Sequence, residues 1–113
     1  MKRSPLRQRS ARRGQVERLD AICRLAMIAK YGEKCILAEH VTCVRCFGHL
    51  DAMHIIGKQG RPDLRHKIVN LLPGCRAHHD WAGRNPREAS LIMLSVLSDE
   101  DRAELQKLTC ERR

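Results

Sequence analysis

The apolar residues of segment 15–31 recur at intervals of three and four positions, the spacing of one face of an α-helix. They are Val16, Leu19, Ile22, Cys23, Ala26, Met27 and Tyr31. Gly32 follows directly and favours a helix end, because glycine readily adopts the left-handed conformation that closes many helices. The pattern predicts an amphipathic helix over 15–31, with Cys23 as a small core residue.

Two β-prone runs follow in the middle of the chain. Residues 49–56 alternate loosely between apolar and polar, and residues 68–72 are rich in branched aliphatic side chains. The Gly- and Pro-containing segment 57–63 predicts a loop between them, and the Pro-Gly pair at 73–74 is expected to end the second run. The pattern predicts two strands joined by a loop.

Three helices are predicted after the second strand. The sequence RAHHDWAGR at 76–84 favours a short helix that ends near Asn85. Within 87–110 an apolar helix precedes a final one, which Ser98 is expected to cap at its N-terminus. These helices should pack with helix 15–31, so residues 15–113 are predicted to form one α+β domain. A role of these helices in binding a protein partner or a second copy is the alternative.

Charge points to a polyanionic partner. The chain has 22 Lys and Arg against 13 Asp and Glu, a net charge of +9, which makes nucleic acid the first candidate. Segment 1–14 is basic, contains no acidic residue and has few apolar residues. This composition predicts a disordered arm. Such an arm would neutralise phosphates without reading sequence, or serve solubility alone.

Cysteine usage suggests a bound metal. The chain has six Cys but only one Trp, one Tyr and one Phe, and so small a core often needs a metal or a disulfide to stabilise it. No apolar segment follows the basic start, and no run approaches a membrane-spanning length. A reducing, cytoplasmic setting is expected, where a Cys-x-x-Cys pair more often binds metal than forms a disulfide.

Two pairs with the same spacing predict a structural zinc site. The four ligands of this Cys3His set are Cys43, Cys46, Cys75 and His78. Two such pairs are the usual way of presenting a tetrahedral zinc site. Cys35 and His40 are further candidates, but the paired set is better spaced. His79 is the alternative to its neighbour as the fourth ligand.

These motifs also resemble a known family. Cys-x-x-Cys, then Asp-Ala-x-His-Ile, an Arg-containing loop and Asn-Leu-x-x-x-Cys-x-x-His-His-x-Trp resemble the HNH endonucleases, most closely a phage type with a KRSPL-like basic start. The resemblance covers roughly residues 40–86. It implies a small ββα-metal core, DNA as substrate, phosphodiester hydrolysis in the cytoplasm of a bacterial host, and a second copy or a phage protein as a further partner.

The three namesake positions of the family fall on His54, Asn70 and His79. The resemblance implies that His54 is the general base, a role that suits a histidine near neutral pH. Asn70 would orient this histidine or tie the two strands together. His79 would bind the catalytic ion, expected to be Mg²⁺, Mn²⁺ or Ni²⁺.

Two positions depart from the family pattern. Met53 stands where the family usually has Asp or His, and Gly83 stands where it often has a further histidine. Asp51 lies two residues before Met53, hence on the same strand face, and is predicted to bind the catalytic ion with His79. Asp80 is the alternative ligand.

Basic residues of the inter-strand loop are expected to contact the substrate backbone. They are Lys58, Arg61, Arg65 and Lys67. Such contacts position a nucleic acid without specifying sequence, so little specificity is predicted. His49 and His66 have no assigned role, although His66 could meet a phosphate. A metal-dependent endonuclease is the leading hypothesis. Its alternatives are a non-catalytic zinc module that binds nucleic acid and a zinc-containing assembly factor.

Overall fold

The computed structural model describes the backbone of residues 3–57 and 60–111, and the side chains of 11–57 and 60–111. Its helices and strands are α1 (Arg3–Tyr31), β1 (Leu50–His54), β2 (Leu71–Cys75), α2 (Arg76–Arg84), α3 (Pro86–Val96) and α4 (Asp99–Cys110). Short 3-10 helices are η1 (Ile36–Glu39), η2 (Pro62–Leu64) and η3 (Ile68–Asn70). The predicted α+β class is confirmed, as is the order strand, loop, strand, helix.

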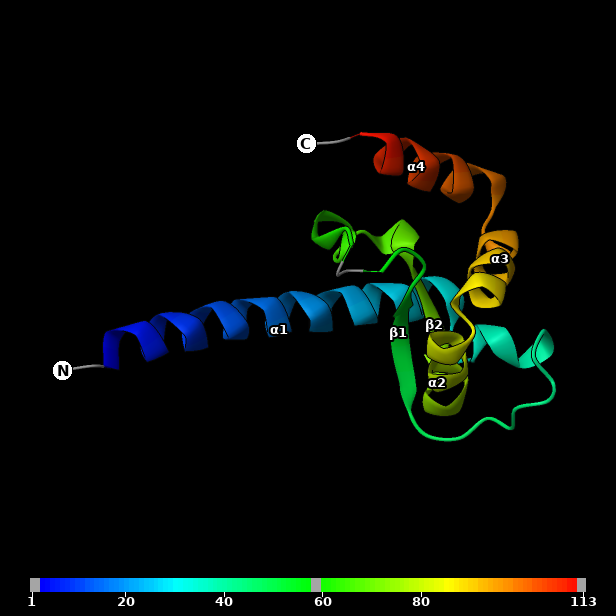
Figure 1. Cartoon of the computed structure of the whole chain (residues 1–113), viewed down its shortest axis with the longest axis horizontal. Coiled ribbons are helices and arrows are strands. Elements are labelled where there is room, and N and C mark those ends of the chain that lie inside the picture. Colours follow the sequence, from blue (N-terminus) through cyan, green and yellow to red (C-terminus); the bar gives the residue numbers. More distant parts are fainter. Residues whose placement is uncertain (1–2, 58–59, 112–113) are drawn as a thin grey trace.

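A two-stranded antiparallel sheet lies at the centre, with α1 along one face and α2 against the other (Figure 1). Asp51 pairs with Gly74 and Met53 with Leu72. The second strand therefore runs through 73–74, where the sequence predicted its end. Pro73 is tolerated because each strand of a two-stranded sheet has an open edge. A Cβ at position 74 would collide with the end of the buried Met53 side chain, which would then have to move.

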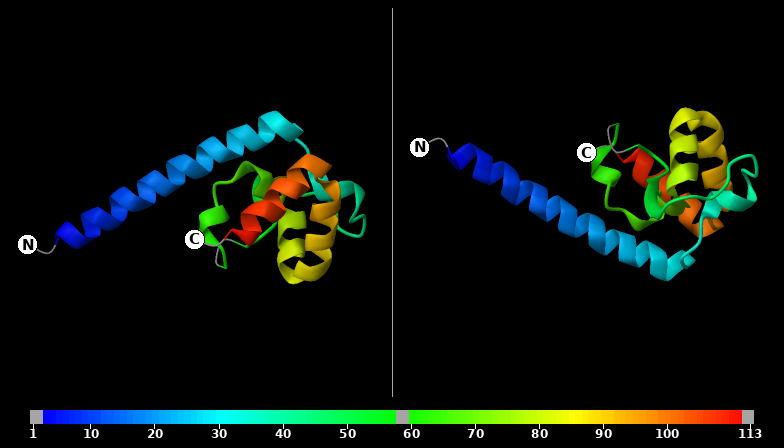
Figure 2. Two further views of the ribbon diagram at one scale, coloured as in Figure 1. Left: turned by 90° about the horizontal axis from the view of Figure 1, so that it is seen from above. Right: turned by 90° about the horizontal axis from the view of Figure 1, so that it is seen from below.

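The N-terminal segment differs from its prediction. Residues 1–14 were expected to be a disordered arm, but α1 is continuous from Arg3 to Tyr31; residues 1–2 lie outside the described part. Leu, Arg, Gln and Ala, which dominate this segment, all favour helix, and Pro5 lies in the first turn, where a missing N–H is harmless. The single Gly14 costs only about 1 kcal/mol. A helix of this length spans about 44 Å, so its first half projects from the body of the protein (Figures 1 and 2).

The core is divided by the sheet. Cys23 and Met27 of α1 pack on Leu71 of β2, which confirms Cys23 as a core residue. On the other face, the largest fully buried side chains of the main core are Leu37, Met53, Leu72 and Leu105. Other members of the predicted α1 stripe remain outside, because Leu19 and Ile22 are 47% and 60% exposed.

The C-terminal helices begin and end as the sequence indicated. The Oγ of Ser98 accepts a hydrogen bond from the backbone N–H of Asp101 at 3.1 Å, which caps α4. Asn85 terminates α2 and leads into Pro86 at the start of α3. None of the described helices is both long and apolar enough to cross a membrane.

Candidate functional site

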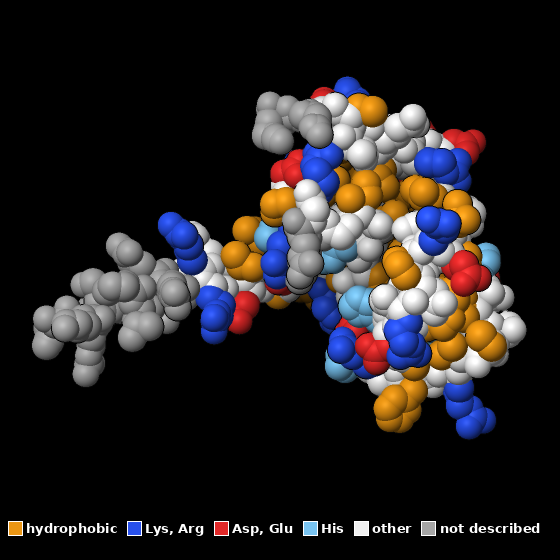
Figure 3. All heavy atoms as spheres, in the orientation of Figure 1, with side chains coloured by type: hydrophobic (Ala, Val, Ile, Leu, Met, Phe, Trp, Pro, Cys, Tyr) orange, Lys and Arg blue, Asp and Glu red, His pale blue; other side chains and the backbone are white. Residues whose placement is uncertain are grey.

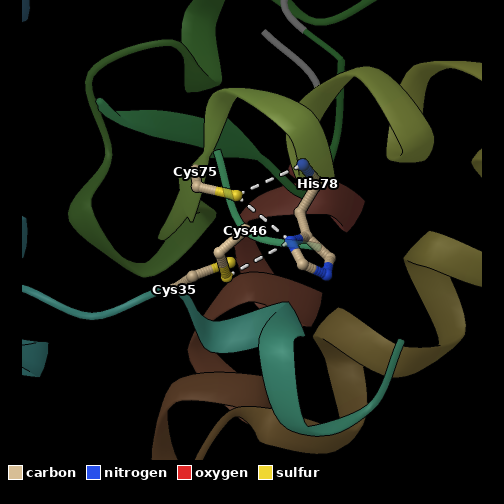
Figure 4. Close-up of side chains that lie close together, drawn as sticks. All are labelled: Cys35, Cys46, Cys75 and His78. Atoms are coloured by element: carbon tan, nitrogen blue, oxygen red, sulfur yellow. Dashed lines mark hydrogen bonds between the residues drawn. The ribbon is translucent and has the colours of Figure 1, made fainter. Parts of the chain in front are cut away.

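A group of four side chains forms a candidate metal centre (Figure 4). It consists of Cys35, Cys46, Cys75 and His78, whose ligand atoms all lie within 4.8 Å of one another. A tetrahedral zinc ion with Zn–S bonds of 2.3 Å needs sulfurs about 3.8 Å apart, so only a small contraction separates this arrangement from a closed site. Three thiols and one imidazole are the donors of structural zinc sites, and the group fits such an ion.

The fourth ligand differs from the sequence prediction. Cys43 is exposed and lies outside the group, whereas Cys35 belongs to it. The reason is the chain reversal after α1. Gly32 adopts a φ of +87°, and the buried Ile36 then anchors η1 in the core, which brings the adjoining Cys35 inward. The position of Cys35 directly before an apolar pair is the sequence signal that the spacing argument overlooked.

The ring of His78 is oriented for metal binding. Its Nδ1 lies 3.1 Å from Cys75 Sγ and 3.6 Å from Cys46 Sγ, while its Nε2 lies 2.9 Å from the carbonyl oxygen of Val41. Since a carbonyl only accepts, Nε2 carries the hydrogen, and in the neutral ring Nδ1 has the lone pair. A second partner of this kind fixes the tautomer of most metal-binding histidines. Nδ1, the nitrogen of His78 that could bind a metal ion, therefore faces the sulfurs of Cys75 and Cys46.

The thiols of the group have unequal acidities. Burial alone would raise the pKa of Cys75, but its hydrogen bonds with the His78 ring, the His78 backbone and the Phe47 backbone lower it to about 6. The pKa of Cys46 is raised to about 11, first by desolvation of its sulfur and second by its hydrogen bond with Cys75. Cys75 also occupies the N-cap of α2, where its Sγ accepts from the His78 N–H at 3.4 Å. One thiolate is thus formed near neutral pH, and binding of a metal would release further protons.

A second polar group adjoins the first on α2. His79 follows the metal-facing histidine, and its Nδ1 lies 2.8 Å from Asp51 Oδ2. His49 Nε2 lies 3.0 Å from the other carboxylate oxygen, and Arg76 Nη1 lies 3.1 Å from Oδ2. Burial alone would raise the pKa of Asp51, but the hydrogen bonds from His79 and Arg76 outweigh it and lower the pKa. The structure thus brings together the two predicted ligands of the catalytic ion.

The two positions that depart from the family pattern offer no ligand. Strand alternation directs Asp51 and Met53 to the same face, but Met53 is 1% exposed and belongs to the core. Gly83 is exposed and has no side chain. The alternative ligand Asp80 does not line the cavity that Asp51 and His79 share. Asp51 and His79 remain as the donors.

His54 ends β1 and shares a cavity of about 360 Å³ with both donors. Further lining residues are Asp20, Cys23, Arg24, His49 and Arg65. His54 Nε2 lies 3.1 Å from the carbonyl oxygen of Arg65. Because this oxygen only accepts, Nε2 carries the hydrogen, and the neutral ring has its basic lone pair on Nδ1. The predicted base and both predicted ligands therefore line one cavity.

Asn70 holds the backbone behind the cavity. It is fully buried, and its Oδ1 accepts from the Ile56 N–H at 2.8 Å. Its Nδ2 donates to the carbonyls of Ile56 and Leu64 at 3.1 and 3.2 Å. Of the two roles expected for Asn70, tying chain segments together fits these bonds, because they fix the turn that follows His54.

Two of the predicted phosphate contacts already have partners within the protein. Arg61 donates to Asp63 and to the final carbonyls of α4, among them Thr109 O at 2.9 Å. Arg65 forms a bidentate pair with Asp20, with distances of 3.0 and 2.7 Å. Their guanidinium groups connect the loop to α4 and α1, and a contact of either residue with phosphate stays a prediction. Lys67 is exposed, and Lys58 lies outside the described residues.

The remaining histidine of the loop is also engaged. His66 Nε2 lies 2.7 Å from Asp20 Oδ1, beside the bidentate pair of Arg65. Sequence reasoning assigned no role to His49 and did not consider Arg24, because neither belongs to a spaced motif. Searches of family models, curated proteins and solved structures gave no match to this chain.

Proposed function

We propose that the protein is a metal-dependent endonuclease that hydrolyses DNA phosphodiester bonds with little sequence specificity. One observation chiefly supports the proposal: His54, Asp51 and His79 line a single cavity although they come from a strand and a helix. A base and two ligands for a divalent ion around one hollow are what metal-assisted hydrolysis requires. The net charge of +9 favours a polyanionic substrate.

In this proposal His54 removes a proton from the attacking water. The carbonyl of Arg65 holds the Nε2–H of the ring at 3.1 Å, which leaves Nδ1 as the nitrogen that accepts the proton. The carbonyl also stabilises the imidazolium that results. Arg65 is itself held by Asp20 of α1, so α1 contributes to the position of the base.

Asp51 and His79 would hold the divalent ion, which when bound would stabilise the charge that develops on the phosphate and on the leaving 3′ oxygen. One carboxylate and one imidazole suit Mn²⁺ or Ni²⁺ better than Mg²⁺, which prefers oxygen donors alone. For the ion to bind, the hydrogen bond between Asp51 and His79 must break, so that both side chains can contact the ion.

Zinc is the proposed occupant of the Cys3His group, in a structural role. The group joins the end of β2 and the first turn of α2 to the segments before η1 and β1. Since His79 follows the zinc ligand His78 directly on α2, the zinc would fix the helix that presents His79 to Asp51. Hydrolytic activity is therefore expected to depend on the zinc indirectly.

A non-catalytic zinc module that binds nucleic acid is the second candidate. It is favoured by the buried Met53 and by Arg76, whose guanidinium lies 3.1 Å from Asp51 Oδ2 and competes with a cation for that oxygen. The module would keep the zinc group and the basic surface but hold no second ion.

Nicking of supercoiled plasmid distinguishes these candidates. The purified protein is incubated with Mg²⁺, Mn²⁺ or Ni²⁺ beside His54→Ala and the matched control His40→Ala, an exposed histidine that does not line the cavity. General-base removal is expected to slow nicking by about 100-fold or more, while the control keeps the wild-type rate. If no metal supports nicking above His54→Ala, the endonuclease is excluded, and DNA binding without nicking would support the second candidate.

A further inference from the structure

Arg24 places a positive charge in the cavity from an element far away in sequence. It lies on α1 and lines the cavity together with Asp51, His54 and His79. Its Nε and Nη2 donate to the carbonyl oxygen of Leu50, at 3.3 and 3.0 Å. Leu50 directly precedes Asp51 on β1, so these two bonds fix the guanidinium beside the proposed ion site.

The charge of Arg24 is not neutralised within the described part of the chain. The arginine ion pairs found there join Arg65 to Asp20, Arg76 to Asp51 and Asp80, Arg61 to Asp63, and Arg102 to Asp99, and none of them includes Arg24. A carbonyl orients a guanidinium without cancelling its charge. Of the two arginines lining the cavity, Arg24 is therefore the one that keeps its charge for a ligand.

We propose that Arg24 is the phosphate-binding residue of this cavity and that it contacts a non-bridging oxygen of the nucleic-acid backbone. This inference rests on the proposed function, because the phosphate it would hold is the one beside Asp51, His54 and His79. The two bonds to Leu50 occupy only part of a guanidinium with five N–H donors, and the others remain for the ligand. Prior orientation lowers the entropy lost when the side chain engages a phosphate.

The course of α1 supplies the rest of the contact surface. Arg12, Arg13 and Arg18 are exposed on the same helix, before Arg24 in sequence. Lys and Arg side chains stand on the described part of the projecting helix, outside the body of the protein (Figure 3). A strand that lies along α1 would meet these charges and reach the cavity at Arg24. The N-terminal segment would then bind phosphates in a salt-dependent way as part of the helix α1, and not as a disordered arm.

Binding of a fluorescein-labelled DNA duplex, measured by anisotropy at 0.1 M salt without added divalent ion, tests the proposal. Arg24→Gln removes the charge but keeps a donor for the Leu50 carbonyl, and Arg24→Ala removes both. Arg87→Ala is the matched control, since it removes the charge of an exposed arginine on α3, outside the cavity and away from α1. A charge-assisted contact is worth about 1.5–3 kcal/mol, so either Arg24 variant should weaken binding by about 10-fold or more, and the control by less than about threefold.

The proposal is overturned if the folded Arg24→Gln variant binds DNA as tightly as the wild type, or loses no more affinity than Arg87→Ala. Circular dichroism and zinc content verify that each variant is folded, and Arg24→Gln decides the matter if Arg24→Ala is not. The assay does not depend on cleavage. If the protein binds DNA through Arg24 but never nicks it, the endonuclease is refuted and the phosphate site is retained. If Arg24→Gln still nicks DNA and binds it with unchanged affinity, the endonuclease is retained and the phosphate site is refuted.

Discussion

Replacing Cys35 by serine should abolish binding of the proposed structural zinc ion, and replacing Cys43 should not. The sulfur of Cys35 belongs to the group of ligand atoms that lie within 4.8 Å of one another, while Cys43 is exposed outside it. Serine matches cysteine in size but lacks the soft thiolate that zinc prefers. The two variants therefore carry the same chemical change at two cysteines, of which only one is placed to bind metal.

The size of the effect follows from the number of ligands. Structural zinc sites bind with about 10–16 kcal/mol, so one ligand of four carries on the order of 3 kcal/mol, about a hundredfold in Kd. At free zinc a hundred times the wild-type Kd, the ion stabilises the fold by about 2.7 kcal/mol. For Cys35→Ser the same concentration equals Kd and gives about 0.4 kcal/mol. The difference lowers the Tm by roughly 10 °C for a chain of this length.

The assay is thermal unfolding at buffered free zinc, with the zinc content of each dialysed protein measured in parallel. Wild type and Cys43→Ser should retain about one zinc ion and unfold within a few degrees of each other, because exposed substitutions usually change stability by less than about 0.5 kcal/mol. Cys35→Ser should lose the ion and the zinc-dependent part of its Tm. Loss of zinc from Cys43→Ser with retention in Cys35→Ser would refute the assigned ligand set.

Three further predictions concern stability. Asn70→Ala should lower the free energy of unfolding by about 2–3 kcal/mol in urea titration, because it deletes three hydrogen bonds of a fully buried side chain; a change below about 0.5 kcal/mol would contradict this role. Gly74→Ala should destabilise by about 1–3 kcal/mol through collision with Met53, and an unchanged urea midpoint would count against this packing. The hydrogen bond from Arg65 lowers the pKa of Asp20 from 3.8 to about 2, so its stabilisation is present above pH 4 and is lost as the pH falls towards 2. Because the Asp20 side chain is 41% exposed, solvent screening reduces this stabilisation to about 1 kcal/mol. The stability of Asp20→Asn should therefore fall by about 1 kcal/mol less than that of the wild type between about pH 4 and pH 2. Equal acid sensitivity of the two proteins would refute the linkage.

Local patterns predicted most of the secondary structure, because hydrophobic period and helix-capping residues act over a few positions. The cap at Ser98 and the end of α2 at Asn85 were recognised in this way. The prediction was wrong for residues 3–14, where charge suggested disorder although the helix propensity of the individual residues is high. It also ended the second strand too early, since nothing local reveals that Pro73 would meet an open edge.

The candidate ion site was predicted from the family resemblance and strand alternation, and groups outside the family pattern were missed. His79 is a namesake position of the family, and strand alternation placed Asp51, 28 positions before it, on the face of Met53. Cys35 and Arg24 reach their groups only through the path of α1 and the turn after it. Sequence could not reveal that Arg61 also binds the carbonyl of Thr109 and that Arg65 binds Asp20, because these partners are 45 or more positions away.

In the proposed function, the cavity of Asp51, His54 and His79 hydrolyses a phosphodiester bond with water as the nucleophile. Cleavage of a DNA duplex in ¹⁸O-enriched water, followed by mass spectrometry of the products, tests this reaction. One ¹⁸O atom should enter the newly formed 5′-phosphate with Mn²⁺ or Ni²⁺ present, and the yield of labelled product should fall by about 100-fold in His54→Ala. Absence of labelled product with every metal, or the same yield of it from His54→Ala, would contradict the claim.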